Sequence, residues 1–434
     1  MLTEAIKRYR FHLVVIGDIL IFVLSMAIVL TRYGYENYSS QFYAHIGPFG
    51  IVLILWLIIF YIFNLYTYKA FGNIMEITRK LSIALITSFS ITVIIFYVFG
   101  RFFELTPKAN LVFLVLVFGI LDLAWRYILR KIFIHKAHRL NVLILAESPL
   151  VQEIIDHTNA NPQLGYFIES FGFKKTELKE YSKNKFVNII VVDGHSLKNK
   201  NVSSTLYNLL PEEIEVLTLI EFYEKIFNCI PPSEVEAEWF IREIAKNKSF
   251  YEGTKHLLEL IFVIVTAPFF ILISILIAIL IAITSPGPVI YKQERIGKNG
   301  RPFMLYKFRT MKTDHSGPLW TTEKDDRVIL FGRLLRHIHF DEIPQLFNIL
   351  RGDISFVGPR PERTELVNNY KQIPHYEIRH IIKPGIIGWA QLNYKASTSL
   401  EEAEKKFQFD LYYLKNRSFI LDIFIILKTV RTIF

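Results

Sequence analysis

The residues best suited to chemistry form an acidic pair in front of an apolar run. Asp341 and Glu342 directly precede Ile343–Leu350, and Pro344 stands near the start of that run. Acidic residues, an early proline and a periodic apolar run together predict a helix N-terminus. The positive end of such a helix is expected to keep Asp341 ionised, and its free N–H groups attract phosphate. The alternative interpretation is that Asp341 only caps the helix.

A rigid arginine follows this predicted helix. Gly352-Asp353 predicts a turn that Asp353 caps, and Ile354–Val357 predicts a short strand leading into Gly358-Pro359-Arg360-Pro361. The prolines on both sides of Arg360 restrict the backbone. A guanidinium held in this way suits bidentate recognition of a phosphate. The alternative is that Arg360 is only a loop charge.

Two more cations share a predicted strand. Pro302–Met311 alternates as a strand does, so the side chains of Lys307 and Arg309 are expected on one face. Two parallel cations suit a diphosphate, and a solvated strand face has the same pattern. His337 and His339 are also two residues apart, but no further His or Cys stands at zinc-ligand spacing, so both are predicted not to bind metal.

Taken together, these motifs resemble those of the monotopic phosphoglycosyl transferases, and the resemblance covers residues from about Lys255 to Phe434. Enzymes of this family transfer a sugar-1-phosphate from a nucleotide diphosphate sugar to a polyprenyl phosphate. In the family pattern Ile387 stands where threonine is usual, which is a mild departure. The matching pieces are, in order, Gly287-Pro288-Val289, Gln293-x-Arg295-x-Gly297, Lys307-Phe308-Arg309-Thr310-Met311, Asp341-Glu342-x-Pro344-Gln345-Leu346, Gly352-Asp353, Val357-Gly358-Pro359-Arg360-Pro361 and Lys383-Pro384-Gly385-x-x-Gly388-Trp389-Ala390-Gln391.

The acidic pair, the cations and the resemblance give a hypothesis for the reaction. Asp341 is the expected nucleophile, which attacks the sugar-bearing phosphorus of a UDP-sugar, releases UMP and forms a phosphosugar-aspartyl intermediate for the polyprenyl phosphate to attack. Glu342 is expected to position a metal or to handle a proton. Mg2+ held by Asp341 and the diphosphate is the expected cofactor. The expected phosphate contacts are Arg360, Arg336, Lys307 and Arg309.

Composition places the chain in a membrane. The 434 residues are 52% hydrophobic, with a mean hydropathy of +0.31. The net charge of +10 suits anionic lipid headgroups and phosphate-bearing substrates. Nucleic acid is the competing partner, but no zinc-finger, RNP or recognition-helix pattern occurs, so none is predicted. The single cysteine, Cys229, excludes intrachain disulfides and cysteine-cluster metal sites.

The N-terminal part predicts four membrane helices. The apolar runs lie at about 11–31, 46–66, 81–100 and 110–129. Each has about the 20 residues that a spanning helix needs, and the first lacks the cleavage site of a signal peptide. Basic residues precede the first run, separate the second from the third and follow the fourth, so both ends are predicted in the cytoplasm. Asp18, Asp122 and Arg126 fall in apolar runs and predict a structural ion pair rather than a proton path.

The middle part predicts a small α/β module. Asn141–Leu145 and Val187–Val192 are short β-branched runs among helical stretches, which indicates a parallel sheet. The first run is followed by Ala146-Glu147-Ser148-Pro149 instead of a glycine-rich loop, so no dinucleotide site is expected. The Tyr-x-x-x-Lys spacing at Tyr181 and Lys185 is therefore interpreted as an accident.

A fifth apolar run, 257–283, contains Pro268 and has basic residues on both flanks. A spanning helix would place one basic flank outside, whereas a helix that bends at Pro268 and returns agrees with the charges. The resemblance implies such a re-entrant helix, although Ala267 replaces the usual serine and Lys255-His256…Glu259 replaces the usual basic pair and aspartate. The alternative is a fifth spanning helix. At the C-terminus, Phe419–Phe434 predicts an amphipathic helix that lies on the membrane or docks on the domain.

These observations predict a membrane α plus α/β protein. The expected domains are a four-helix transmembrane bundle (1–135), a Rossmann-like module without a nucleotide site (136–250) and an α+β phosphoglycosyl transferase domain with the re-entrant helix (251–434). The expected function is the first membrane step of exopolysaccharide, capsule or O-antigen synthesis, at the cytoplasmic face of a bacterial inner membrane. Larger members of the family imply a homodimer. Two rivals are a non-catalytic polysaccharide assembly protein and a membrane-bound nucleotide-sugar dehydratase or epimerase. The sequence does not predict the sugar.

Overall fold

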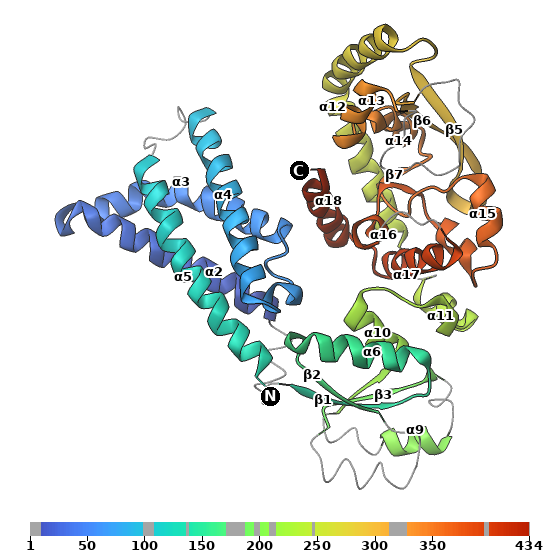
Figure 1. The fold of residues 1–434 in the computed structure, drawn as a ribbon, viewed down its shortest axis with the longest axis horizontal. Coiled ribbons are helices and arrows are strands. Elements are labelled where there is room, and N and C mark those ends of the chain that lie inside the picture. The colour runs from blue at the N-terminus through green and yellow to red at the C-terminus, as the bar shows by residue number, and fades with distance from the viewer. Residues whose placement is uncertain are drawn as a thin grey trace. The chain divides into compact units, whose positions relative to one another are not determined.

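The computed structural model forms two compact units, Met1–Phe222 and Tyr223–Phe434 (Figure 1). The structure describes residues 10–98, 108–135, 139–170, 187–194, 200–207, 214–244, 248–311, 328–394 and 399–433. The Tyr181-x-x-x-Lys185 spacing lies outside the described residues. The predicted division into three domains stays a prediction, and each unit is best understood by itself.

Four long apolar helices begin the first unit. They are α2 (Arg10–Leu30), α3 (Tyr35–Ile62), α4 (Ile74–Val98) and α5 (Lys108–Ile134). Each is long and apolar enough to cross a membrane. α2 packs against α3 and α5, and α4 packs against the same two helices. Aromatic rings fill the contact: Trp56 lies edge-to-face with Phe22 and Phe118, with ring centroids 5.5 and 5.3 Å away.

The predicted charge pairing among these helices is confirmed. Arg126 donates to Asp122 at 2.7 Å and to Asp18 at 2.8 Å, and it also donates to the carbonyl of Leu65 at 2.9 Å. The guanidinium and both carboxylates are buried. A charge removed from water is tolerated only when it is paired, so the three side chains tie α2 and α5 together.

A parallel sheet completes the first unit, as predicted. Its strands are β1 (Leu140–Leu145), β2 (Tyr166–Ser170), β3 (Ile189–Val192) and β4 (Glu215–Thr218), in the order β2-β1-β3-β4. Ser148 caps α6 (Pro149–Ala160) directly after β1 by accepting from the N–H of Leu150 at 3.2 Å. The other described helices of this unit are η1 (Thr31–Tyr33), η2 (Tyr68–Phe71), η5 (Pro162–Leu164), α9 (Lys200–Tyr207) and α10 (Leu219–Phe227), and α10 continues into the second unit.

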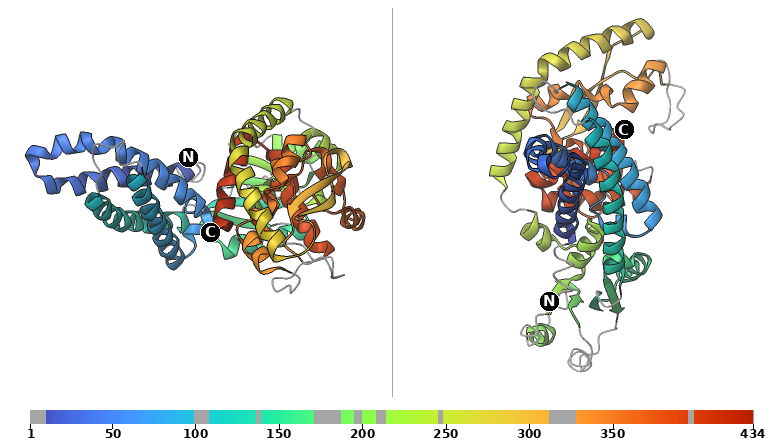
Figure 2. Two further views of the ribbon diagram at one scale, coloured as in Figure 1. Left: turned by 90° about the horizontal axis from the view of Figure 1, so that it is seen from above. Right: turned by 90° about the vertical axis from the view of Figure 1, so that its left-hand side faces the viewer.

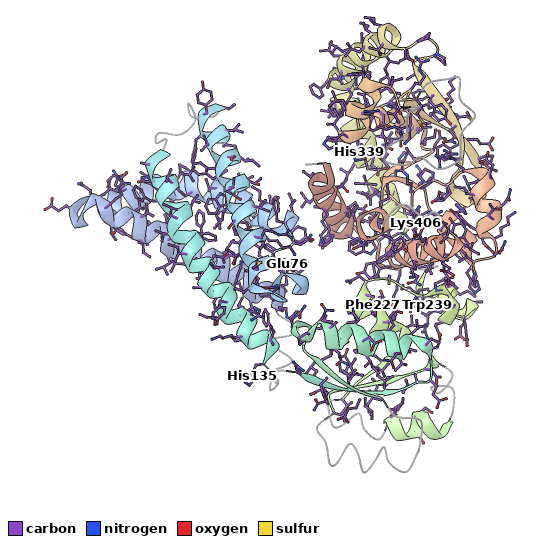
Figure 3. The ribbon with its side chains drawn as sticks, viewed as in Figure 1. Glu76, His135, Phe227, Trp239, His339 and Lys406 are labelled. Atoms are coloured by element: carbon purple, nitrogen blue, oxygen red, sulfur yellow. The ribbon has the colours of Figure 1, made fainter. Side chains whose placement is uncertain are left out.

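The second unit begins with short helices that pack on its core. After α10 come η7 (Pro232–Glu234) and α11 (Ala237–Glu243). Glu224 forms an ion pair of 2.6 Å with Lys415, and the Nζ of Lys415 lies 5.6 Å from the ring centroid of Trp239. Trp389 donates to the carbonyl of Asn228 at 3.0 Å. Figure 3 shows Phe227 and Trp239 at the edge of this unit.

The longest helix in the described part of the chain, α12 (Ser249–Thr284), contains Pro268. It is the fifth helix long and apolar enough to cross a membrane. Figure 2 shows, in its right-hand view, that α12 changes direction along its length. A proline removes one N–H of the helix and clashes with the preceding turn, so it is the ordinary cause of such a bend. Whether α12 re-enters or spans stays a prediction.

The rest of the second unit is built on a hairpin and a pair of short parallel strands. β5 (Ile290–Ile296) pairs antiparallel with β6 (Pro302–Phe308) around η8 (Lys298–Gly300), and β7 (Ser355–Val357) pairs parallel with β8 (Gly385–Ile387). β6 ends at Phe308, earlier than the predicted Met311. The helices are α13 (Leu330–His337), η9 (Phe340–Glu342), α14 (Gln345–Arg351), α15 (Thr364–Tyr370), η10 (Tyr376–Ile381), α16 (Trp389–Asn393), α17 (Leu400–Asn416) and α18 (Phe419–Ile433).

The C-terminal helix α18 docks on the domain, one of the two predicted arrangements, and its contact with a membrane stays a prediction. Ile425 and Asp422 are buried, and the carboxylate of Asp422 accepts from the hydroxyl of Tyr413 at 2.8 Å, so one face docks on the domain. Ile420 is 82% exposed and Ile423 57% exposed, so the other face is apolar and open. An open apolar face of this kind suits a membrane surface.

Candidate active site

The acidic pair lies in a tight connection between two short helices. α13 ends at His337, and His339 takes a left-handed conformation with φ of 57°. The turn η9 then carries Asp341 and Glu342 before α14 begins after Pro344. Figure 3 shows His339 beside α13. The acids therefore precede the helix, as predicted, and they lie in a separate short turn of their own.

Glu342 is the paired member of the two. It forms ion pairs with Lys307 at 2.6 Å and with Arg360 at 3.3 Å. Burial alone would raise the pKa of Glu342, but the charges of Arg360 and Lys307 outweigh it and lower that pKa to about 2. Burial lowers the pKa of Lys307, and the charge of Glu342 opposes that shift. Three residues from separate parts of the sequence thus form one partly buried charge cluster.

Asp341 has different surroundings. Its residue is 8% exposed, and among the described residues its carboxylate has no hydrogen-bond or ion-pair partner. Burial raises the pKa of Asp341, and the nearby charges of Lys307 and Arg336 oppose that shift only in part. The surroundings thus raise the pKa of Asp341, because the loss of water outweighs the favourable charges. That Asp341 is ionised at neutral pH stays a prediction.

The predicted phosphate contacts divide into two groups. Lys307 and Arg360 contact Glu342, and Arg336 donates to the hydroxyl of Thr310 at 2.8 Å while its charge acts on Asp341. Arg309 does not join them. It lies beyond the end of β6, is buried, and donates to the carbonyls of Pro286 at 2.8 Å and Ser285 at 2.5 Å. The structure therefore gives Arg309 the role of holding the chain after α12.

Sequence reasoning missed the residues that hold the loop of Arg360. Arg295 donates to the carbonyl of Pro361 at 3.1 Å. Burial, with the charge of Arg360, lowers the pKa of Arg295 to about 10. Arg379 donates to the carbonyl of Arg360 at 3.0 Å and to the carboxylate of Asp410 at 2.8 Å. The sequence did offer a signal for Arg295, because this residue belongs to one of the motifs shared with the family. It offered none for Arg379, since nothing near Arg379 in the sequence points to position 360.

A second buried ion pair supports the same loop. Lys406, labelled on α17 in Figure 3, contacts Glu362 at 2.6 Å. Burial alone would raise the pKa of Glu362, but the charges of Lys406 and Arg379 lower it to about 2. On the other side of the loop, a Cβ on Gly385 would collide with the backbone of Gly358, so the chain can approach this closely only with glycine.

Comparison with known proteins places the site in a recognised domain. Residues 250–434 match the family model described as bacterial sugar transferase. The UDP-N-acetylgalactosamine-undecaprenyl-phosphate N-acetylgalactosaminephosphotransferase of Aeromonas hydrophila is 39% identical over 186 residues, which are 42% of this chain and 44% of that protein. The UDP-glucose:undecaprenyl-phosphate glucose-1-phosphate transferase of Escherichia coli (strain K12) is 43% identical over 36% of this chain and 34% of its own length. The chain thus matches less than half the length of these two relatives.

A third relative is matched over most of its length. The exopolysaccharide production protein PSS of Rhizobium leguminosarum bv. phaseoli is 39% identical over 176 residues, which are 38% of this chain and 86% of that protein. The acidic pair, the cations around it and the loop of Arg360 all lie inside residues 250–434. The family model therefore covers the part of the chain that carries the candidate site.

Proposed function

The chain belongs to the bacterial sugar transferase family, and from that premise we propose that it transfers a sugar-1-phosphate from a UDP-sugar to a polyprenyl phosphate. The observation that carries the proposal is the contrast within the acidic pair. A buried Asp341 stands beside a Glu342 that already neutralises Lys307 and Arg360. Two relatives are named for transfers of this kind to undecaprenyl phosphate.

The reaction proceeds in two displacements. A carboxylate oxygen of Asp341 attacks the phosphorus that bears the sugar, a new O–P bond forms, and the P–O bond to the inner phosphate breaks. UMP leaves with the electron pair of that bond. An oxygen of the polyprenyl phosphate then attacks the same phosphorus and breaks its bond to Asp341. The carboxylate is regenerated, and the product is a polyprenyl diphosphate sugar.

The surrounding cations serve the charges of this reaction. An anionic nucleophile attacks an anionic diphosphate, so positive charge near the reacting phosphorus lowers the barrier. The positive charges of Lys307 and Arg336 favour the ionised form of Asp341, and Arg360 joins the same cluster through its ion pair with Glu342. We assign the substrate phosphates to these three cations. Glu342 holds two of them in place rather than acting as an acid or base, because its pKa of about 2 keeps it ionised.

The donor set fits Mg2+ if the substrate supplies most of the ligands. The described residues contain no group of three or more His, Cys, Asp or Glu side chains that could hold a metal. Asp341 offers one carboxylate, and Mg2+ is often bound by one or two carboxylates together with substrate phosphates. When bound, the ion supplies positive charge to the diphosphate. The chain's own contribution is to present Asp341 and to keep Glu342 engaged with cations.

The proposal also states where in the cell the enzyme acts. Five apolar helices support a membrane protein, and the basic flanks support a cytoplasmic site on the inner membrane with α12 as a re-entrant helix. There a soluble nucleotide sugar and a lipid phosphate meet. The step would begin assembly of an exopolysaccharide, a capsule or O-antigen. A homodimer remains part of the proposal.

Substitution of Asp341 by Asn tests the covalent scheme. The variant lacks the nucleophile, so UMP release from UDP-sugars and labelling of the protein by the sugar phosphate are both expected to fall by at least about a thousandfold. The measurement is single-turnover UMP release, with mass spectrometry of the trapped protein, over a panel of UDP-sugars that also identifies the sugar. Continued transfer by the variant contradicts the scheme. Absence of any UMP release by the unmodified chain favours the non-catalytic assembly protein instead, and bound NAD would favour the dehydratase or epimerase.

A further inference from the structure

An apolar groove of about 290 Å³ lies along the second half of α12. All ten side chains that line it are apolar. One wall comes from α12 and includes Leu272 and Leu276, and the other comes from α13 and includes Leu334. These three side chains are 65%, 61% and 54% exposed, so the groove is open along its length and is not a closed core.

The groove extends to the residue that precedes the acidic pair in the chain. Its far wall includes Ile338 and Phe340, and Phe340 is the residue immediately before Asp341. The lining residues Phe331, Leu334 and Leu335 of α13, with Ile338 directly after its end, repeat at helical spacing and form one face. Arg336 lies on another side of the same helix, where it contacts Thr310 and its charge acts on Asp341. One short helix therefore presents an apolar face to the groove and a cation to the reacting carboxylate.

We propose that this groove binds the isoprenoid units nearest the phosphate of the polyprenyl phosphate acceptor, which places that phosphate beside Arg336 and Asp341. The assignment rests on the proposed function. A nucleotide sugar does not suit the groove, because an entirely apolar lining would leave its polar groups without hydrogen bonds. A branched hydrocarbon suits it, and α12 is apolar enough to lie in a membrane, so a lipid chain can enter from the side.

The geometry separates the two substrates of the reaction. The phosphate end of the acceptor meets the cations, and the hydrocarbon meets only apolar side chains. The donor needs no part of the groove in order to react with Asp341. Filling the groove is therefore expected to impair the second displacement while leaving the first intact.

The test compares two tryptophan substitutions on the same helix. Leu276→Trp fills the groove, whereas Ile279→Trp is its matched control, since Ile279 lies outside the lining and is 53% exposed. For Leu276→Trp the KM for polyprenyl phosphate is expected to rise about tenfold, which corresponds to the loss of roughly two buried methylene groups. Single-turnover UMP release, measured before acceptor is added, is expected to stay at the level of the unmodified chain. Ile279→Trp is expected to change neither quantity.

Three outcomes overturn the proposal. The first is an unchanged KM in Leu276→Trp, including the case in which bulk phospholipid chains occupy the groove and only thermal stability in vesicles shifts. The second is an equal rise in both tryptophan variants. The third is a loss of UMP release in a Leu276→Trp protein that remains folded. If Leu276→Trp does not fold, Leu334→Trp fills the groove from the other wall and must meet the same expectations. A failure of the proposed function is recognised separately, because the unmodified chain then releases no UMP even before acceptor is added.

Discussion

Asp341 and Glu342 are neighbours in the chain, but burial affects them in opposite ways. Glu342 lies within 3.3 Å of two cations, and their charges lower its pKa to about 2. Asp341 is also buried, yet the nearby cations only partly offset the cost of removing its charge from water, so its pKa is raised. The ionised Asp341 is therefore less stabilised by its surroundings than its neighbour, which suits a group that must form a new bond.

The raised pKa of Asp341 predicts the acid side of the pH profile. The attack needs the carboxylate, so activity is lost as the pH falls through the pKa of Asp341, and that pKa lies above the ordinary aspartate value of 3.8. Arg336 lowers this pKa, so Arg336→Gln should move the acid limb to higher pH, and Arg336→Lys should move it less because the charge is kept. Single-turnover UMP release against pH measures the limb. A limb at the same pH in all three proteins would show that another group controls it.

The two acids are also predicted to differ in their effect on stability. The folded-state pKa of Glu342 is about 2 against an ordinary 4.5, so its stabilisation is present above pH 4.5 and is lost as the pH falls towards 2. Glu342→Gln leaves Lys307 buried without its counter-charge and should cost about 2–3 kcal/mol at neutral pH. For Asp341 the sign is reversed: a raised pKa means that the ionised form destabilises the fold above that pKa. Asp341→Asn should therefore leave the free energy of unfolding unchanged or raise it.

Denaturant unfolding of the purified protein in detergent compares these variants. The opposite order, with Asp341→Asn the less stable, would contradict the surroundings assigned to the two carboxylates.

At the scale of the elements, the site depends on how a loop is held between distant helices. The motif spacing predicted β7 and the turn at Gly352, because those features depend on nearby residues. It misjudged Arg309, since residues two apart share a face only while the strand continues, and β6 ends at Phe308. It also missed Arg379 and Asp410. Arg379 donates to the backbone of Arg360, and Asp410 holds Arg379 where η10 packs on α17. Long-range pairing of this kind leaves no local pattern in a single sequence.

Asp410 is predicted to act on the reaction through Arg379 and the backbone of Arg360. Asp410→Asn keeps the shape of the side chain but removes the charge that holds Arg379, so the loop of Arg360 loosens. The KM for the UDP-sugar is expected to rise about tenfold, roughly the effect of one lost positioning hydrogen bond to a charged group. The matched control is Glu224→Gln, which breaks another buried ion pair to α17 at Lys415 without touching the loop.

Initial-rate kinetics with varied UDP-sugar separate the two variants. Equal KM values in both would show that Asp410 only stabilises α17, and the positioning role would be abandoned.

At the scale of the whole molecule, charge and hydrophobic pattern predicted the major parts well. The four N-terminal helices, the parallel sheet and the pairing of Arg126 follow from strong local signals: length, β-branched runs and the cost of an unpaired charge among apolar residues. The extent of the second unit does not follow from local signals. Residues 223–244 join this unit through contacts with residues near 389–415, which are far away in the sequence. The described residues whose charges act on the acidic pair all lie within this second unit.

The second unit is therefore predicted to carry the first displacement without the rest of the chain. A protein of residues 223–434 retains every described contact of Asp341, Glu342 and Arg360, and it contains the whole of the part that matches the family model, residues 250–434. Its single-turnover UMP release, measured in detergent or vesicles, is expected to stay within about tenfold of the full chain, a difference of roughly 1.4 kcal/mol. Asp341→Asn in the same shortened protein is the control and should abolish the release. A shortened protein that is folded by circular dichroism and releases no UMP would show that the first unit contributes directly to the reaction.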